Sequence, residues 1–174
     1  MARELGALIL STLERNALFV SAALPNRLYP PMFNRYGEGM YFGSHVDGAI
    51  RMIGHGQKLR TDLSATLFLS PKDSYEGGEL IVENEFGHQS IKLDGGDMIV
   101  YAAAARHRVA PIMSGERLAA VLWIQSLVRG DAERLQLFEL DRTIQRLTEL
   151  QADSDSLVRL SAHYHGLLRL WSDT

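Results

Sequence analysis

Cysteine is absent from the 174-residue sequence. Its absence excludes disulfide scaffolds, iron–sulfur clusters, cysteine-type zinc fingers and thiol nucleophiles. Long apolar runs are absent too, because the longest stretches, such as Leu118–Ile124, have the length of a strand rather than of a bilayer-spanning helix. Apolar residues recur at helical spacing near the N-terminus, which is typical of an amphipathic helix rather than of an export signal. We therefore expect a cytoplasmic protein with no membrane attachment.

A large excess of charge of one sign is also missing. The sequence carries 18 Lys and Arg against 21 Asp and Glu, a formal net charge of −3. This balance argues against a protein that coats nucleic acid, and we expect no nucleic-acid partner. Hydrophobic residues make up 46% and charged residues 22%, which is typical of a folded globular chain. The length suits one domain, and we expect residues 1–174 to form it.

The middle of the chain, about residues 27–128, has the pattern of a mainly β protein. Short apolar runs alternate there with glycine-rich turns, whereas residues 2–16 show helical spacing. The clearest predicted strands are Ser64–Leu69, Glu79–Val82, Gln89–Leu93, Asp97–Tyr101 and Leu118–Ile124. Many short strands separated by such turns predict a barrel or jelly roll, with the N-terminal helix packed on it.

The C-terminal part, about residues 131–172, predicts two helices. Asp131 is the expected N-cap of the first, and a polar break at 153–156 separates it from the second. The second helix carries an apolar stripe formed by Leu157, Leu160, Tyr164, Leu168 and Trp171. We expect both helices to pack on the sheet, with the stripe largely buried against the barrel or a partner subunit.

The best candidate metal ligands are His45, Asp47 and His107. In extended backbone, residues two apart point to the same face, so His45 and Asp47 can reach one metal ion. His107 follows a predicted strand and is the best third ligand. Two imidazoles and one carboxylate on one face suit ferrous iron and oxygen chemistry. The alternative is that the His-x-Asp pair lies in a surface turn between Gly43 and Gly48.

Arg117 is the best candidate for binding an anion. It begins the apolar strand 118–124, and a guanidinium entering such a strand is costly to bury unless it meets a negative group. Its planar fork matches a carboxylate with two hydrogen bonds, as a dicarboxylate cosubstrate would require. The alternative is a solvated charge at the strand end, paired with Glu116.

Taken together, these residues resemble a known family over nearly the whole chain. The matching segments are Phe33-Asn34-Arg35-Tyr36, Gly39, Phe42-Gly43-Ser44-His45-Val46-Asp47, residues 60–69, Glu76-Gly77-Gly78-Glu79-Leu80, Gly96-Asp97-Met98, His107-Arg108-Val109, Gly115-Glu116-Arg117 and Trp123-Ile124-Gln125-Ser126. They are similar to the iron(II)- and 2-oxoglutarate-dependent dioxygenases of the prolyl and lysyl hydroxylase type, and more closely to the bacterial PKHD-type hydroxylases. The resemblance implies a double-stranded β-helix core, jelly-roll or cupin-like.

The resemblance also implies roles for individual residues. His45, Asp47 and His107 match the iron ligands, Arg117 matches the residue that binds the distal carboxylate of 2-oxoglutarate, and Tyr36 matches an aromatic residue of the cosubstrate pocket. The implied reaction couples oxidative decarboxylation of 2-oxoglutarate, to succinate and CO2, with hydroxylation of a substrate by O2. L-Ascorbate is the implied reductant that keeps the iron reduced.

Several functional questions stay open at this level. Members of the family usually carry a further N-terminal segment, which the chain apparently lacks. The substrate is a small molecule or a peptidyl side chain, and Arg51, Lys58 and Arg60 are expected to form a basic lid over the site. Association of identical chains is also open. The alternative from another functional class is a non-catalytic, cupin-like module that binds a metal or small ligand for sensing or storage.

Overall fold

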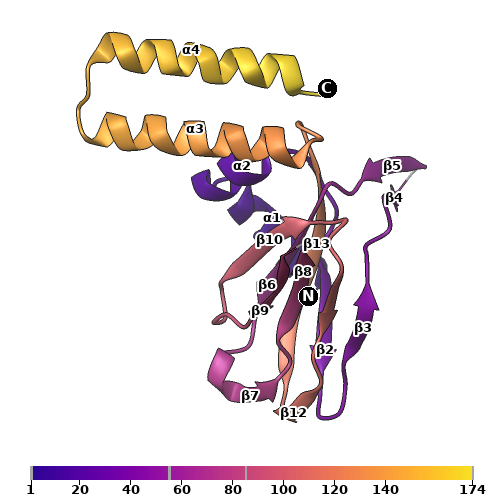
Figure 1. The fold of residues 1–174 in the computed structure, drawn as a ribbon. Coiled ribbons are helices and arrows are strands. Elements are labelled where there is room, and N and C mark those ends of the chain that lie inside the picture. The colour runs from indigo at the N-terminus through magenta and orange to yellow at the C-terminus, as the bar shows by residue number, and fades with distance from the viewer. Residues whose placement is uncertain (1, 55, 85, 174) are drawn as a thin grey trace.

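The structure, a computed structural model, describes residues 2–54, 56–84 and 86–173 (Figure 1). Two antiparallel sheets form its core. The major sheet runs in the order β1 (Pro25–Leu28), β13 (Arg117–Ser126), β6 (Leu63–Phe68) and β10 (Met98–Ala102), and β2 (Met32–Tyr36) also pairs with β13. The minor sheet has the order β3 (Phe42–His45), β11 (His107–Val109), β8 (Leu80–Asn84) and β9 (Gly87–Ile91).

Two short two-stranded sheets complete the β structure. β4 (Ile50–Ile53) pairs with β5 (Gln57–Arg60), and β7 (Tyr75–Gly77), which follows the 3-10 helix η1 (Lys72–Ser74), pairs with β12 (Ile112–Gly115). Strands distant in sequence are neighbours in both sheets, as β13 lies beside β2 and β6 while β11 lies beside β3 and β8. This arrangement is a double-stranded β-helix, and the predicted fold class is confirmed.

The two central strands of the major sheet, β6 and β13, bury side chains on both faces of the sheet, because successive residues of a strand point to opposite faces. Leu63 and Ala65 of β6 and Leu122 and Ile124 of β13 form one buried cluster with residues of the helices α1 (Ala2–Leu13) and α2 (Ala17–Ala23). The residues between them point to the opposite face, toward the interior between the sheets. The sequence pattern did not predict the helix α2. Its N-cap is Asn16, whose side chain accepts a hydrogen bond from the Phe19 amide.

The C-terminal helices form an outer layer at one end of the β core (Figure 1). α3 (Asp131–Glu149) packs on α2, and α4 (Ser154–Trp171) packs on α3 rather than on a sheet. Gly130, and not Asp131, is the N-cap of α3, so that part of the prediction was wrong. The expected burial of the α4 stripe was also overestimated, because Tyr164, Leu168 and Trp171 pack on the Leu24–Val128–Leu137 cluster while remaining partly exposed in this outermost layer.

Among the described residues, no single helix is both long and apolar enough to cross a membrane. α1 and α2 reach that length only as a pair, and the two helices are bent by 82° relative to each other.

Candidate metal and cosubstrate site

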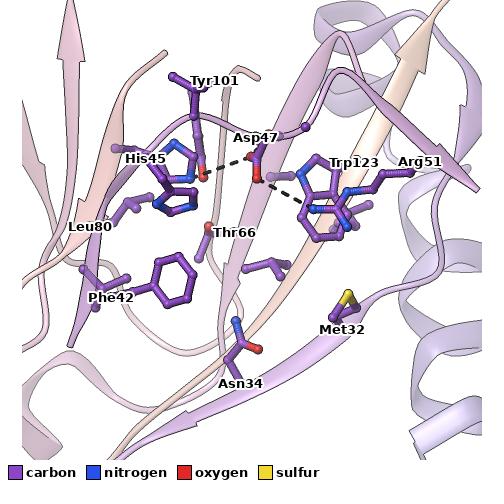
Figure 2. Close-up of a pocket in the computed structure, with 18 of the residues that line it drawn as sticks. Met32, Asn34, Phe42, His45, Asp47, Arg51, Thr66, Leu80, Tyr101 and Trp123 are labelled. Carbon is purple, nitrogen blue, oxygen red and sulfur yellow. Dashed lines mark hydrogen bonds and ion pairs between the residues drawn. The ribbon is translucent and has the colours of Figure 1, made fainter. Parts of the chain in front are cut away.

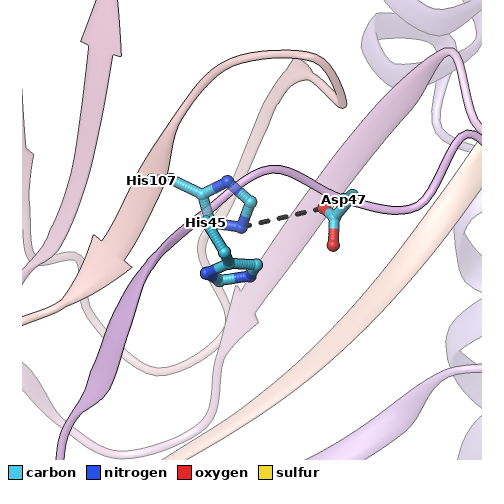
Figure 3. A group of neighbouring side chains, drawn as sticks. All are labelled: His45, Asp47 and His107. Carbon is cyan, nitrogen blue, oxygen red and sulfur yellow. Dashed lines mark ion pairs between the residues drawn. The ribbon is translucent and has the colours of Figure 1, made fainter.

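The structure brings His45, Asp47 and His107 together at one end of the minor sheet (Figure 3). His45 ends β3 and His107 begins β11, and the two residues face each other across this antiparallel pair with ring centroids 4.3 Å apart. Asp47 lies two residues beyond β3, where its amide donates to the carbonyl of Ala103. One donor atom from each of the three side chains lies within 4.8 Å of the other two, so a single metal ion can contact all three.

Backbone carbonyls orient both imidazoles. His45 Nδ1 lies 2.8 Å from the Gly43 carbonyl, and His107 Nδ1 lies 3.0 Å from the Ala105 carbonyl. Because a carbonyl oxygen only accepts hydrogen bonds, Nδ1 is the donor in each contact, which leaves Nε2 of each ring as the nitrogen that can face a metal. This is the arrangement in which a histidine presents Nε2 to a metal while a hydrogen bond fixes its ring.

The Asp47 carboxylate is nearly buried and has three polar neighbours. Its Oδ2 accepts a 2.5 Å hydrogen bond from Ser64 Oγ and lies 3.7 Å from His107 Nε2. Its Oδ1 lies 3.8 Å from a terminal nitrogen of Arg51. Ser64 comes from the major sheet, so the carboxylate is positioned by contacts from both sides of the β core.

A cavity of about 330 Å³ opens beside the three side chains and extends between the two sheets (Figure 2). Its wall includes the three candidate ligands and both candidate cosubstrate residues, Arg117 and Tyr36. Apolar side chains make up much of the remainder, among them Met32, Phe42, Leu80, Val109, Val121 and Leu122. The cavity therefore combines a potential metal site, a buried cation and a largely water-excluding wall.

Arg117 is only 1% exposed, and its guanidinium lies near two aromatic rings. Its central carbon is 5.6 Å from the ring centroid of Tyr36 and 5.2 Å from that of Phe68. Burial lowers the pKa of Arg117, although the neighbouring hydroxyl of Tyr75 acts in the opposite direction. The alternative pairing with Glu116 does not form, since Glu116 pairs instead with Arg35 at 2.5 Å.

Two of the three nitrogens of the Arg117 guanidinium have no hydrogen-bond acceptor among the described residues. Its Nε and one terminal nitrogen are buried without a partner in the described part of the chain, and so is the hydroxyl of Tyr75. Buried unpaired donors are costly, and a carboxylate with its two oxygens is the ligand that best satisfies a guanidinium fork. These unsatisfied donors fit the distal carboxylate of 2-oxoglutarate.

Tyr101 is a cavity residue that the sequence analysis did not identify. Its ring meets that of His107 edge to face at 5.0 Å, and burial raises its pKa to about 12. The hydroxyl is therefore neutral at physiological pH, and it forms a hydrogen bond with Thr66, another residue of the cavity wall. Tyr101 faces Ser64 in the β10–β6 pair, and only that long-range pairing brings it to the site.

Of the three residues expected to form a basic lid, one lines the cavity. Arg51 of β4 lines the cavity, whereas Lys58 is exposed on β5. Arg60 points elsewhere and pairs with Asp62 at 2.7 Å and Asp173 at 3.4 Å.

Comparison with known proteins places this chain in a family. The profile of the 2OG-Fe(II) oxygenase superfamily matches residues 31–125, and the profile of the PKHD-type hydroxylase C-terminal domain matches residues 131–173. A PKHD-type hydroxylase of Burkholderia ambifaria is 58% identical over 174 residues, which cover all of this chain and 77% of that protein. A PKHD-type hydroxylase of Xanthomonas campestris is 51% identical over 176 residues, with 99% of this chain and 77% of that protein covered.

The fold has a solved counterpart at lower sequence identity. A prolyl-4-hydroxylase from Pseudomonas putida superposes with a TM-score of 0.53 at 20% identity, covering 69% of this chain and 64% of that one. This likeness concerns the fold alone. The two profile matches and the close relatives carry the assignment: the chain belongs to the PKHD-type hydroxylases of the 2OG-Fe(II) oxygenase superfamily, and is an iron- and 2-oxoglutarate-dependent hydroxylase.

Proposed function

We propose that His45, Asp47 and His107 hold the iron of this hydroxylase, and that Arg117, with Tyr36 beside it, holds the distal carboxylate of 2-oxoglutarate. The observation that carries the proposal is the buried guanidinium of Arg117, which has two nitrogens without an acceptor among the described residues and lines the same cavity as the three donor side chains. A non-catalytic metal-binding module has no need of a buried cation in that place.

The donor set fits ferrous iron. Two neutral imidazoles and one carboxylate, all on one side, leave coordination positions for the cosubstrate and for O2. When bound, iron and 2-oxoglutarate supply the oxidising chemistry, in which decarboxylation to succinate and CO2 accompanies hydroxylation of the substrate. We assign the reaction to this class of dioxygenases.

The contribution of the chain's own residues is positioning and exclusion of water. Arg117 anchors the cosubstrate at one point, and the rings of Tyr36 and Phe68 fix the guanidinium. Ser64 holds Asp47, and the two backbone carbonyls hold the imidazoles. Because these groups are already placed, little reorganisation is needed when the metal and cosubstrate bind.

We further propose that residues 1–174 act as one catalytic unit. The support is the continuous packing from the β core through α2 to α3 and α4. The substrate class is a small molecule or a peptidyl side chain, and L-ascorbate is the proposed reductant.

The experiment is anaerobic titration of the protein with Fe(II) and then 2-oxoglutarate. Chelation of the keto acid to iron should produce a weak visible charge-transfer band, and aerobic incubation should release succinate. Arg117→Gln should lower the affinity for 2-oxoglutarate that is measured from the band. Arg35→Gln, which removes an exposed cation nearby, should leave that affinity unchanged. Metal uptake without the band would support the binding-module alternative instead.

A further inference from the structure

We infer that Arg51 binds a carboxylate of the substrate, so that this hydroxylase acts on a carboxylate-bearing molecule. The inference rests on the proposed function, because it assumes that Arg117 holds the cosubstrate. Its basis is the position of Arg51 in the cavity, the unsatisfied donors around it and the charge balance of the cavity wall.

Arg51 and Arg117 lie toward different ends of the cavity. Arg117, Val121 and Trp123 of β13 line it from one strand face, as expected for residues an even number of positions apart. Arg117 and Trp123 are separated by six residues, which corresponds to about 20 Å along a strand. Arg51 stacks at the Trp123 end, where its guanidinium carbon is 3.1 Å from a Trp123 ring centroid (Figure 2).

The candidate metal ligands lie nearer the Arg51 end. Ser64 is the register partner of Trp123, and its hydroxyl contacts Asp47. Phe68, four residues further along β6, lies beside Arg117 instead. A cosubstrate that joins the metal to Arg117 therefore extends away from Trp123. It leaves Arg51 on the other side of the metal, where the substrate is to be accommodated.

Arg51 has donors that the described residues do not satisfy. Its Nε is buried without a partner, and the indole nitrogen of Trp123 is in the same condition. The separation of 3.8 Å between Arg51 and Asp47 Oδ1 is an ion-pair distance but too long for a hydrogen bond. Two unpaired donors at one end of the cavity call for an acceptor-rich ligand, and the guanidinium fork matches a carboxylate.

The charge balance of the cavity points the same way. Asp47 is the one acidic side chain among the cavity-lining residues, against the cations Arg51 and Arg117. Fe(II) adds two positive charges and 2-oxoglutarate two negative charges, so loading the site leaves the balance unchanged. One positive charge stays uncompensated in a partly buried cavity, and an anionic group on the substrate compensates it.

The test uses small probes in place of the unidentified substrate: acetate against acetamide, and benzoate against benzamide. The sequence contains two tryptophans, so a Trp171→Phe background leaves Trp123, beside Arg51, as the single tryptophan. The full-length protein, loaded anaerobically with Fe(II) and saturating 2-oxoglutarate, is titrated with each probe while Trp123 fluorescence is recorded. We expect at least one carboxylate to bind about tenfold or more tightly than its amide.

Variants separate the charge of Arg51 from its geometry. Arg51→Gln should abolish the preference for the carboxylate, and Arg51→Lys should retain part of it because the charge stays but the fork is lost. Lys58→Gln removes an exposed cation from the same β4–β5 pair and should retain the full preference. The affinity for 2-oxoglutarate, measured separately by the charge-transfer band, should be retained in the Arg51 variants and should change less than about twofold in Lys58→Gln, whose side chain lies outside the cavity wall.

The absence of a preference for either carboxylate in the parent protein would overturn the inference, and so would a preference that survives Arg51→Gln. Loss of 2-oxoglutarate binding in Arg51→Gln would also overturn it, since Arg51 would then serve the cosubstrate. Failure of the parent protein to bind 2-oxoglutarate at all is a different result, and it would contradict the proposed function itself.

Discussion

Ser64 Oγ donates a 2.5 Å hydrogen bond to Asp47 Oδ2, and this bond joins the major sheet to the carboxylate at the centre of the candidate site. Partners of this kind orient metal-ligating carboxylates. Ser64→Ala should therefore lower the affinity for Fe(II) about 10- to 100-fold without unfolding the protein. Ser90→Ala, at an exposed position of β9, is the matched control for metal titration. Equal affinities in both variants would contradict the role assigned to Ser64.

Metal binding and cosubstrate binding should be separable by mutation. Arg117→Ala should weaken 2-oxoglutarate binding by about 2–5 kcal/mol, the usual cost of removing one partner of a buried charge pair, and Arg117→Lys by less. Neither change should alter Fe(II) affinity. His107→Ala should impair Fe(II) binding first and cosubstrate binding as a consequence. Separate titrations of metal and 2-oxoglutarate check this, and unchanged cosubstrate affinity in Arg117→Ala would refute the assignment.

Gly78 lies close to the side chain of Arg117, and a methyl group at position 78 should displace that side chain. Gly78 has a φ of +68°, and an added Cβ would lie 2.4 Å from Ile112 Cδ1 and 3.1 Å from Arg117 Cδ. We expect Gly78→Ala to cost about 1–3 kcal/mol in unfolding free energy and to weaken 2-oxoglutarate binding. Gly166→Ala, in an open position of α4, is the control and should leave cosubstrate affinity intact. Urea unfolding and 2-oxoglutarate titration provide the measurements.

Asp153 should make the stability of α4 depend on pH. Its side chain accepts a hydrogen bond from the Ser156 amide, and hydrogen bonding to that amide holds the pKa of Asp153 below its usual value. A depressed pKa means that the contribution is present above the unfolded-state pKa and is lost as pH falls through the folded-state value. Asp153→Ala should lower the melting temperature at neutral pH, with the difference shrinking in acid. In Asp153→Asn, a neutral cap, the acid-dependent part should disappear. A pH-independent difference for Asp153→Ala would contradict this account.

The helix α4 should be needed for solubility. It covers the cluster of Leu24, Val128 and Leu137 with Tyr164, Leu168 and Trp171. Ending the chain at Asp153 removes that cover and exposes apolar surface, so the truncated protein should aggregate at concentrations where the full chain is monodisperse. Light scattering and thermal melting test this. A truncated chain that scatters and melts like the full chain would show that α4 is dispensable.

Local patterns in the sequence were sufficient for the element types and for part of the site. A continuous apolar run predicted the strand at 118–124, and the spacing of His45 and Asp47 predicted that both point the same way. Such inferences succeed because side-chain direction repeats every two residues in a strand and about every 3.6 in a helix. α2 was missed because it is only seven residues long. Asp131 was misplaced as a cap because the residue before it has no side chain to reveal the boundary.

The remaining features depend on which distant strands pair, and only the tertiary structure decides that. The register of β3 with β11 sets His107 against His45, and that of β10 with β6 brings Tyr101 opposite Ser64. The tertiary structure also gives Arg51 and Arg60 different surroundings. Arg51 lines the cavity, whereas Arg60 pairs with Asp62. Residue types and spacing therefore determined which chemical groups the protein carries. The long-range pairing of strands, whose energy comes from burying both sheet faces at once, determined which of those groups meet.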